Sequence, residues 1–459
     1  MKFIGRTCTP DEERWRIYNK IAVRILPLVF LGYTIASIDR MNVAFAKLQM
    51  GSDLGLSNTM YGFGAGIFFI GYCLFEIPSN MILHRVGARV WLARIMIMWG
   101  LLSAATMFVQ TPMQFYVLRF LLGVSEAGFY PGALLYLTYW FPRYARSQAV
   151  SYLLLGTSFA AIVGGPLAGS IMQFLDNVAG LRGWQWVFLI EGLPASILGI
   201  IVLIVLKNRP AEANWLTARE KEIVIGDLAE DARMQASRGG DRKRFGDAFR
   251  NANIWCLVFA NFCNLSTLYG VQFWIPTIIE RVARTSVFAT GLVTAALAVV
   301  PATALILAAR HSDKTGERRW HAAAGFLTSL VGLTLAGTFS DNAYLALTGL
   351  VLANCGVSIA ATAIFALPAT FVVGAAAAAA FALITTVGNL AGYASPFLIG
   401  VLRDATGGFS LAFYGLGAVA LTGAIIILST PALRSGRPIA PRPAETADPA
   451  PQAAGQEGI

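Results

Sequence analysis

Twelve long apolar runs divide the sequence, and they limit the possible folds more than any other feature. A helix needs about 20 mostly apolar residues to cross a bilayer, and each run is close to that length. The expected spans are 21–44, 58–82, 91–109, 113–139, 147–171, 184–206, 252–276, 286–309, 320–338, 343–367, 372–401 and 409–430. The sequence therefore predicts an all-α membrane protein with twelve transmembrane helices.

The composition agrees with this fold class. Hydrophobic residues make up 56% of the chain and charged residues only 13%, whereas soluble proteins carry about 25% charged residues. The net charge of +10 comes from basic residues in short loops between apolar runs, not from one basic patch. We therefore expect the lipid bilayer as the environment and no nucleic acid as a partner.

The distribution of Lys and Arg predicts the orientation. If both termini lie on one side, that side carries 28 of the 35 basic residues and the other side carries 5, while Arg40 and Arg119 lie inside spans. Basic loops stay in the cytoplasm, so both termini are expected there, with the chain in the cell inner (plasma) membrane. The start, "MKFIGRTCTPDEERWR", is too acidic and polar for a cleaved signal peptide.

The polar intervals divide the chain into parts. Thr217 and Glu220 have capping-box spacing, which predicts a short helix in the longest polar interval. The C-terminal segment is rich in Pro, Ala and Gly and is predicted to be disordered. The expected parts are a cytoplasmic N-terminus (1–20), a six-helix bundle (21–206), a cytoplasmic linker (207–250), a second six-helix bundle (251–430) and a disordered tail (431–459).

A faint internal repeat relates the two halves. The loop after the second span reads "NMILHRVGARV", and the loop after the eighth span reads "ARHSDKTGERR". Each places a basic residue two positions before a glycine and another two positions after it: Arg85, Gly87 and Arg89, and Lys314, Gly316 and Arg318. Many transporters are built from internal repeats, with a central site between the two bundles.

Four acidic residues fall within the expected spans, and all are in the first half: Asp39, Glu76, Glu126 and Glu191. Intramembrane charges are costly and usually functional, so any proton coupling is expected to be a property of that half. The five cysteines and three histidines form no disulfide framework or metal-ligand cluster. No Walker A sequence or nucleophile elbow is present, so neither a cofactor nor an enzyme is expected.

Helical geometry places some of these charges relative to one another. Arg119 and Glu126 are two turns apart on one face of the fourth span. Asp39 and Arg40 are about 100° apart around the first span and must point in different directions. Tyr33 lies two turns before Arg40 and shares its face, while Asp39 and Arg119 lie at comparable depth, where they can pair.

The loops resemble the motif of the major facilitator superfamily, written G-x-x-x-D-R-x-G-R-R. The C-terminal copy keeps the acid, glycine and basic residues, while the N-terminal copy has Asn80 and His84 at the usual Gly and Asp positions. "IDRMNVAFA", "GYCLFEIPSN", "RFLLGVSEAGFYPG" and "GWQWVFLIEGLPA" resemble the anion:cation symporter family within that superfamily. The resemblance implies two pseudo-symmetric six-helix bundles, alternating access, and import of organic anions that is commonly coupled to protons. The gating residues that it implies are Arg85, Gly87, Arg89, Asp313, Gly316 and Arg318.

The resemblance also implies roles for the intramembrane charges. Arg40 would bind a substrate carboxylate through its bidentate fork. Asp39 and Glu126 would carry protons, because burial and a neighbouring Arg act on a carboxyl pKa in opposite directions. The alternative is that Asp39 and Arg119 form a permanent salt bridge between the first and fourth spans. For Glu76 and Glu191, a structural or gating role is favoured over substrate contact.

Further polar and aromatic residues are expected to line the substrate site beside Arg40 and Arg119. The alternative for each is an interhelical hydrogen bond. Related sequences often have an amide near Thr385 and a Trp at the position of Phe365. The set is Tyr33, Tyr72, Thr157, Gln272, Thr362, Phe365, Thr385 and Asn389.

The sequence therefore predicts a proton-coupled transporter that imports a small carboxylate such as tartrate, a sugar acid or an aromatic acid. The expected partners are this substrate and protons, and the expected oligomeric state is a monomer. A uniporter or exchanger of organic anions is the first alternative. A transporter-like sensor is the second, although the linker is too short to resemble a signalling domain.

Overall fold

The computed structural model describes residues 4–5, 11–238, 247–368 and 375–430. The predicted disordered tail (431–459) and part of the linker (239–246) lie outside the described residues. The α-helices are α1 (Glu12–Asp53), α2 (Asn58–Val86), α3 (Ala88–Ala105), α4 (Pro112–Glu126), α5 (Phe129–Thr138), α6 (Arg143–Phe174), α7 (Gly183–Val205), α8 (Ala218–Arg238), α9 (Asp247–Arg250), α10 (Ala252–Gln272), α11 (Ile275–Ala283), α12 (Val287–Thr315), α13 (Arg319–Thr338), α14 (Ala343–Ile364), α16 (Ala375–Asn389), α17 (Ala391–Thr406) and α18 (Ser410–Ser429).

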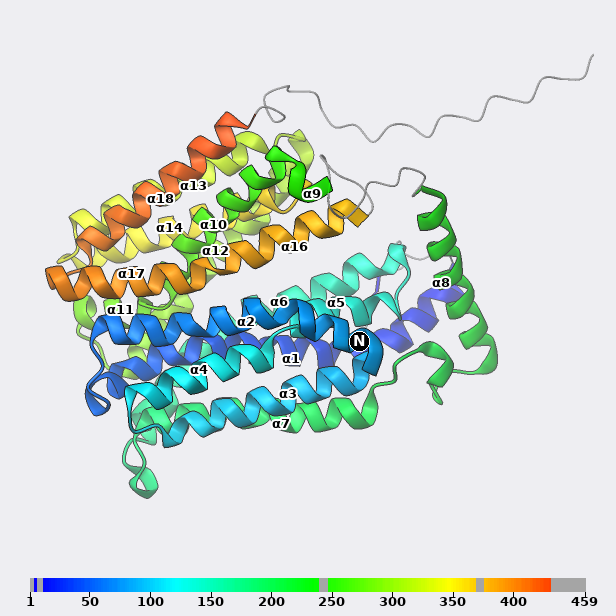
Figure 1. The fold of residues 1–459 in the computed structure, drawn as a ribbon, viewed down its shortest axis with the longest axis horizontal. Coiled ribbons are helices and arrows are strands. Elements are labelled where there is room, and N and C mark those ends of the chain that lie inside the picture. The colour runs from blue at the N-terminus through cyan, green and yellow to red at the C-terminus, as the bar shows by residue number, and fades with distance from the viewer. Residues whose placement is uncertain (1–3, 6–10, 239–246, 369–374, 431–459) are drawn as a thin grey trace, which may run out of the picture.

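Two helical bundles lie side by side (Figure 1). One contains α1 to α7, the other contains α10 to α18, and α8 lies across one end of the first bundle. Among the described residues, 12 helical segments are long and apolar enough to cross a membrane. This confirms the twelve predicted spans and the fold of two six-helix bundles.

Local sequence explains where many of the helices begin. The side chains of Ser57, Thr111, Ser286 and Asn342 each accept a hydrogen bond from a backbone N–H of the first turn of α2, α4, α12 and α14. Such caps satisfy donors that have no partner within the helix. The first helix begins at Glu12 behind an Asp11 cap and so extends well beyond the predicted apolar span.

Two predicted spans are each formed by two helical segments. The fourth is interrupted between α4 and α5, where Gly128 has a φ of 89°. This left-handed conformation costs a glycine little but strains other residues. The break places Glu126 at the last position of α4. The eleventh span is interrupted at Leu390, between α16 and α17.

The two bundles contact each other through α2 with α17 and through α6 with α12. Glycines allow the backbones to approach closely at both contacts. A Cβ atom on Gly62 would lie 2.3 Å from the Pro396 carbonyl oxygen, and one on Gly291 would lie 2.3 Å from the Gly165 carbonyl oxygen. Small residues serve this purpose in membranes, because association there depends on close packing.

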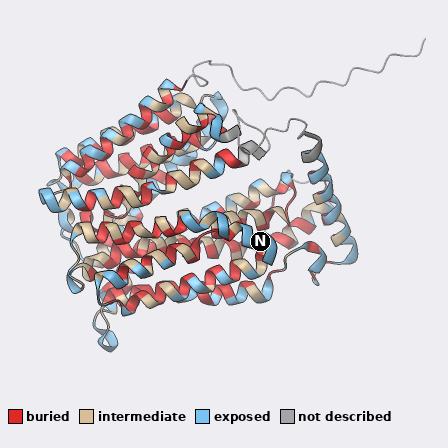
Figure 2. Ribbon diagram, in the orientation of Figure 1, coloured by how far each residue is buried: buried red, intermediate tan, exposed pale blue. Residues whose placement is uncertain are grey.

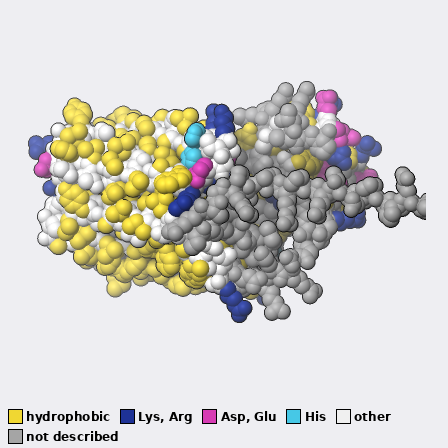
Figure 3. All heavy atoms as spheres, turned by 90° about the horizontal axis from the view of Figure 1, so that it is seen from above, with side chains coloured by type: hydrophobic (Ala, Val, Ile, Leu, Met, Phe, Trp, Pro, Cys, Tyr) yellow, Lys and Arg dark blue, Asp and Glu magenta, His cyan; other side chains and the backbone are white. Residues whose placement is uncertain are grey.

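The surface fits a protein that spans a bilayer. Buried residues lie on the inner faces of the helices and exposed residues on their outer faces (Figure 2). The outward faces include large apolar side chains such as Ile204 and Leu307. Figure 3 shows a broad apolar area with charged side chains toward either side of it along the long axis. This pattern matches a hydrocarbon-facing band between polar ends.

Helix α8 is held against the first bundle by charged and hydroxyl groups. Asp227 accepts hydrogen bonds from Arg14 Nε at 3.0 Å, Tyr18 Oη at 3.0 Å and Tyr144 Oη at 2.8 Å. The helix begins as its sequence predicts, because Thr217 and Glu220 exchange hydrogen bonds between each side chain and the other's backbone N–H. The linker helix is therefore anchored on α1 and α6.

Candidate functional site

An ion pair between Arg40 of α1 and Glu126 of α4 lies at the centre of the candidate site. The Nε and Nη2 atoms of Arg40 lie 2.8 Å and 2.5 Å from the same oxygen, Glu126 Oε1. Glu126 is completely buried, while 20% of the Arg40 side chain is exposed. The second carboxylate oxygen, Oε2, has no hydrogen-bond partner. Part of the Arg40 side chain is therefore exposed, whereas its pairing partner is not.

Asp39 points away from this pair, as its position next to Arg40 on the helix requires. It accepts hydrogen bonds from Ser103 Oγ of α3 and, at 3.0 Å, from Asn42 Nδ2. No ion pair joins it to Arg119 within the described part of the chain. The possible Asp39–Arg119 salt bridge is therefore wrong: Asp39 is hydrogen-bonded to Ser103 of α3 and to Asn42 of its own helix.

Arg119 is almost completely buried, with 1% of its surface exposed. Its Nη2 atom donates a long hydrogen bond of 3.4 Å to the Ala65 carbonyl, and Nε and Nη1 have no partner in the structure. The guanidinium carbon lies 5.1 Å from the centre of the Phe68 ring. A buried cation without an acidic contact is costly, so this residue is an unsatisfied positive charge close to the site.

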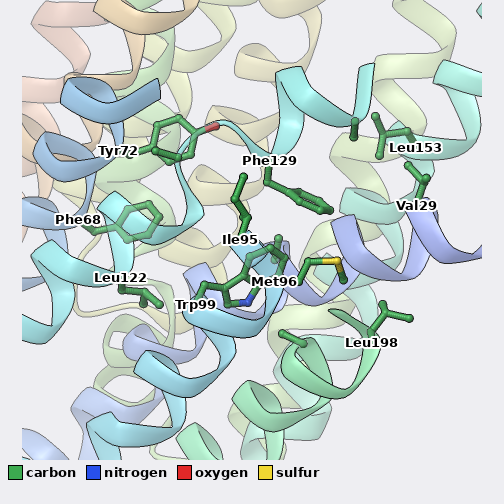
Figure 4. Packing of buried hydrophobic residues seen from close by; sticks show 14 of the residues in the cluster. Val29, Phe68, Tyr72, Ile95, Met96, Trp99, Leu122, Phe129, Leu153 and Leu198 are labelled. Atoms are coloured by element: carbon green, nitrogen blue, oxygen red, sulfur yellow. The ribbon is translucent and has the colours of Figure 1, made fainter. Parts of the chain in front are cut away.

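Aromatic side chains surround Arg40. Its guanidinium carbon lies 5.2 Å from the ring centre of Tyr72 and 5.8 Å from that of Phe68. Figure 4 shows these two rings projecting from α2 on the same side. Tyr33 stacks on Tyr130 with ring centres 5.2 Å apart. Such rings can stabilise a cation and also offer flat apolar surface to a ligand.

The second bundle reaches the site through Tyr269 of α10. The electrostatic neighbours of Arg40 include Glu126 and three tyrosines, Tyr72, Tyr33 and Tyr269, and also Glu76 and Arg119. Tyr269 packs against Phe69 of α2 at 4.6 Å between ring centres, and its hydroxyl lies 3.4 Å from Asn389 Oδ1 of α16. Arg40 and Asn389, both predicted from sequence, are thus linked across the bundles.

Sequence reasoning missed Tyr269. A lone tyrosine in an apolar span carries no charge to mark it. A usable signal was its position three residues before Gln272, because residues at this spacing share a helix face. Ser103 and Asn42, the partners of Asp39, were missed for the same reason.

Other predicted lining residues make no hydrogen bond, ion pair or cation–π contact with Arg40 within the described part of the chain. The hydroxyls of Thr157, Thr362 and Thr385 bond to carbonyls of their own helices, at 2.7 Å, 2.8 Å and 2.9 Å. Phe365 packs against Phe381 at 5.8 Å, and Gln272 is half-buried at the end of α10. Their predicted contact with substrate remains a prediction.

The other two intramembrane acids differ from each other. Glu76 of α2 accepts a hydrogen bond of 3.1 Å from Thr386 of α16, so it joins the two bundles. Glu191 of α7 is 4% exposed, and neither of its carboxylate oxygens has a hydrogen-bond partner. The contact made by Glu76 suits a role in the relative movement of the bundles.

The repeated loops have matching backbone geometry. Gly87 and Gly316 end α2 and α12 with φ angles of 95° and 67°, and each N–H bonds to the carbonyl four residues earlier. Arg89 donates from Nε to the Leu203 carbonyl at 2.6 Å, while Arg318 pairs with Asp313 at 3.1 Å. A positive φ at both sites explains the two glycines.

The bundles are also joined at the end remote from α8. The Asp404 carboxylate of α17 accepts bonds from the backbone N–H of Asn58 and Thr59, at 3.1 Å and 2.8 Å, and from both of their side chains, at 2.7 Å. It therefore caps the first turn of α2, a helix of the other bundle. Lys47 of α1 lies 4.1 Å from the centre of the Trp274 ring of the second bundle.

Comparisons with known proteins agree with this architecture. A model of the Major Facilitator Superfamily matches residues 29–286 and 284–454. The chain is 42% identical over 423 residues to a protein of Pseudomonas putida named metabolite transport protein NicT, covering 92% of this chain and 96% of that protein. It is 40% identical over 428 residues to a protein of Agrobacterium vitis named tartrate transporter, covering 93% and 98%.

A solved structure of a D-xylose–proton symporter has the same fold. Its TM-score is 0.73, with 16% sequence identity, covering 89% of this chain and 97% of that one. At this identity the likeness concerns the fold alone.

Proposed function

The chain belongs to the Major Facilitator Superfamily, and we propose that it is a proton-coupled carrier of a small organic anion. The observation that carries this proposal is the Arg40–Glu126 pair, in which one side chain is accessible and the other completely buried. The proposed substrates are carboxylates such as tartrate, a sugar acid or an aromatic acid. A relative named as a tartrate transporter supports this class.

Substrate and Glu126 compete for the same guanidinium in the proposed mechanism. Both Arg40–Glu126 contacts go to one carboxylate oxygen, so protonation of Glu126 weakens both together. The freed fork of Arg40 can then hold a substrate carboxylate in two charge-assisted hydrogen bonds. When substrate leaves, Glu126 loses its proton and pairs with Arg40 again. Proton and substrate therefore bind together.

Asp39 and Arg119 lie close to the Arg40–Glu126 pair and support the competition between Glu126 and substrate. Asp39 is buried on the α3 side and Arg119 lies beside Phe68, which also contacts Arg40. Their charges offset one another at a distance without forming a direct pair. We propose that Arg119 keeps the site positive and that Asp39, as a second proton site, adjusts that charge during the cycle.

Alternating access follows from where the bundles are joined. The hydrogen bonds to Asp404 close the end remote from α8. By the distribution of basic residues, the α8 end is cytoplasmic and the chain resides in the plasma membrane. We propose that the described state is closed to the outside, and that opening requires Asp404 to leave the first turn of α2.

Uptake into proteoliposomes tests the proposal. Labelled carboxylates are supplied with and without an inward proton gradient, and Arg40→Lys is compared with the natural protein. We expect accumulation that requires the gradient, and a half-saturation concentration at least about tenfold higher in Arg40→Lys, because lysine keeps the charge but lacks the fork. Failure of every carboxylate to be transported, or unchanged kinetics in the variant, would refute the proposed substrate class.

Exchange of anions without protons is the second candidate function. The complete burial of Glu126 beside Arg40 supports a carboxyl group that gains a proton when the pair separates, and it argues against exchange alone. Accumulation that ignores the proton gradient, together with rapid exchange of labelled for unlabelled substrate, would favour an exchanger.

A further inference from the structure

The charges accessible at the site limit which carboxylates it can carry. Resting on the proposed function, we propose that the site takes one carboxylate group per turnover, attached to a body with an aromatic ring, and one proton. Dicarboxylates such as tartrate are then poor substrates, although a relative is named for tartrate.

The second bundle contributes no positive charge to the middle of the membrane. The sequence contains no Lys or Arg from residue 251 to 280, from 285 to 309, or from 320 to 402. These ranges contain nearly all of the membrane-spanning sequence of that bundle. A second carboxylate pointing toward α10, α14 or α16 would therefore meet no cation.

Near the site, the first bundle offers one accessible cation among the described residues. Arg40 has 20% of its side chain exposed, whereas Arg119 is 1% exposed and lies against Phe68. Lys47 lies at the far end of α1, between Asn58 and the Trp274 ring. The fork of Arg40 can hold a single carboxylate in the bidentate manner.

Charge balance also limits the substrate to one carboxylate group. Glu126 is the only acid paired with Arg40 in the described structure, so a proton on Glu126 releases one positive charge. A monocarboxylate restores neutrality. A second carboxylate would have no accessible cation to pair with, because Arg119 is buried and lies against the Phe68 ring. Burial of an unpaired charge is strongly unfavourable. One proton and one monoanion also make the transported set electrically neutral.

Aromatic groups dominate the surroundings of the released cation. Tyr72 and Phe68 lie beside Arg40, Tyr33 stacks on Tyr130, and Tyr269 of the second bundle is an electrostatic neighbour of Arg40. These rings offer flat surfaces and a few hydroxyls, which suits an aromatic body with few polar substituents. A polyhydroxylated sugar acid needs a partner for each hydroxyl that it buries.

A panel of five anions tests the proposal on the full chain in proteoliposomes. The probes are benzoate, cyclohexanecarboxylate, phthalate, tartrate and gluconate, each driven by an inward proton gradient. We expect the specificity constant for benzoate to exceed those for phthalate and tartrate at least about tenfold, and those for gluconate and cyclohexanecarboxylate about threefold or more. Transport of a dicarboxylate as well as or better than benzoate overturns the one-carboxylate limit. A preference for gluconate or cyclohexanecarboxylate over benzoate overturns the proposal that the substrate carries an aromatic ring.

Membrane potential tests the charge balance separately. With the potential set by potassium and valinomycin, an inside-negative voltage should change the initial rate of benzoate uptake less than about twofold, because no net charge crosses. Strong stimulation would indicate more than one proton per monoanion. Strong inhibition would indicate that the substrate and protons transported together carry a net negative charge. Either result contradicts the proposed transport of one proton with one monoanion.

An added cation provides a gain-of-function test. Asn389→Lys places an ammonium near Tyr269 on the side of the second bundle. The ratio of phthalate to benzoate transport should then rise about tenfold. Ser52→Lys, on the exposed end of α1, adds the same charge away from the site and should leave the ratio unchanged. An equal rise in both variants would show that the general field, and not a second binding group, sets the preference.

The outcomes separate this inference from the proposed function. Transport of phthalate or tartrate in preference to benzoate leaves a proton-coupled anion carrier intact but overturns the inference. If folded, monodisperse protein transports none of the five anions, the proposed function falls and the inference falls with it.

Discussion

Single residues in this molecule acquire their roles from the helix that each one faces. Asp39 and Arg40 are neighbours in sequence, yet one binds Ser103 of α3 and the other binds Glu126 of α4. The sequence was sufficient to predict that the two diverge, because the helical rotation per residue is fixed. It was not sufficient to predict their partners, since these lie 64 and 86 residues away and depend on how the helices pack.

The Ser103 hydroxyl is expected to stabilise the fold by donating a hydrogen bond to Asp39. Ser103→Ala leaves Asn42 as the only hydrogen-bond donor to a completely buried carboxyl, which should lower the free energy of unfolding by about 1–3 kcal/mol. Thermal unfolding in detergent measures this loss. Thr422→Ala is the control, because its exposed hydroxyl bonds only to its own helix. An equal effect in both variants would contradict the assigned role of Ser103.

At the scale of elements, the sequence predicted those features that depend on residues close together in the chain. The twelve apolar runs and the Thr217–Glu220 cap depend on neighbouring residues, and all appear in the structure. The break at Gly128 was missed because the apolar run continues through it. The four-bond cap that Asp404 gives to α2 joins segments 346 residues apart, so it carries no local signature.

Attachment of α8 to the first bundle is expected to depend on Asp227. Asp227→Ala removes the partner of Arg14, Tyr18 and Tyr144, and local opening of α8 should become easier by about 2–3 kcal/mol. Hydrogen exchange in the helix would then speed up about 30- to 160-fold. Glu13→Ala removes an exposed pair with Arg219 and should change exchange little. Similar exchange rates in the two variants would show that Asp227 does not anchor the helix.

Acidification is expected to loosen the same helix through Glu220. Burial opposes the ionisation of this carboxyl, but hydrogen bonds from Lys20 and Thr217 outweigh burial and lower its pKa. A lowered pKa contributes stability above the unfolded value of about 4.3, and this contribution is lost as the pH falls through the folded value. Exchange in α8 should therefore quicken below about pH 4, and less so in Glu220→Gln. An identical pH profile in the variant would remove Glu220 from this effect.

The whole molecule is two packed bundles, with residues of both bundles near the candidate site and the Asp404 contact at the end remote from α8. Glycine contacts between α2 and α17 and between α6 and α12 allow the bundles to meet closely. Tyr269 and Asn389 bring the second bundle to Arg40, which belongs to the first. Movement of one bundle against the other would therefore remodel the site and the Asp404 closure together.

Locking the Asp404 contact is expected to stop transport. Thr59→Cys with Asp404→Cys, with the native cysteines replaced by serine, can be bridged by a short bifunctional thiol reagent, because these side chains are 2.7 Å apart at their oxygens. Uptake should cease on bridging and recover on reduction. Each single variant, treated in the same way, should keep transporting. Full uptake by the bridged protein would mean that this end need not open.

The most direct test of the central claim is gradient-driven accumulation and substrate exchange by the natural protein and Glu126→Gln, measured side by side in proteoliposomes. Glutamine cannot lose a proton and does not pair with Arg40 as an anion. The account predicts that the variant loses accumulation but still exchanges labelled for unlabelled substrate. Equal accumulation by both proteins would contradict the claim that Glu126 and the substrate compete for Arg40.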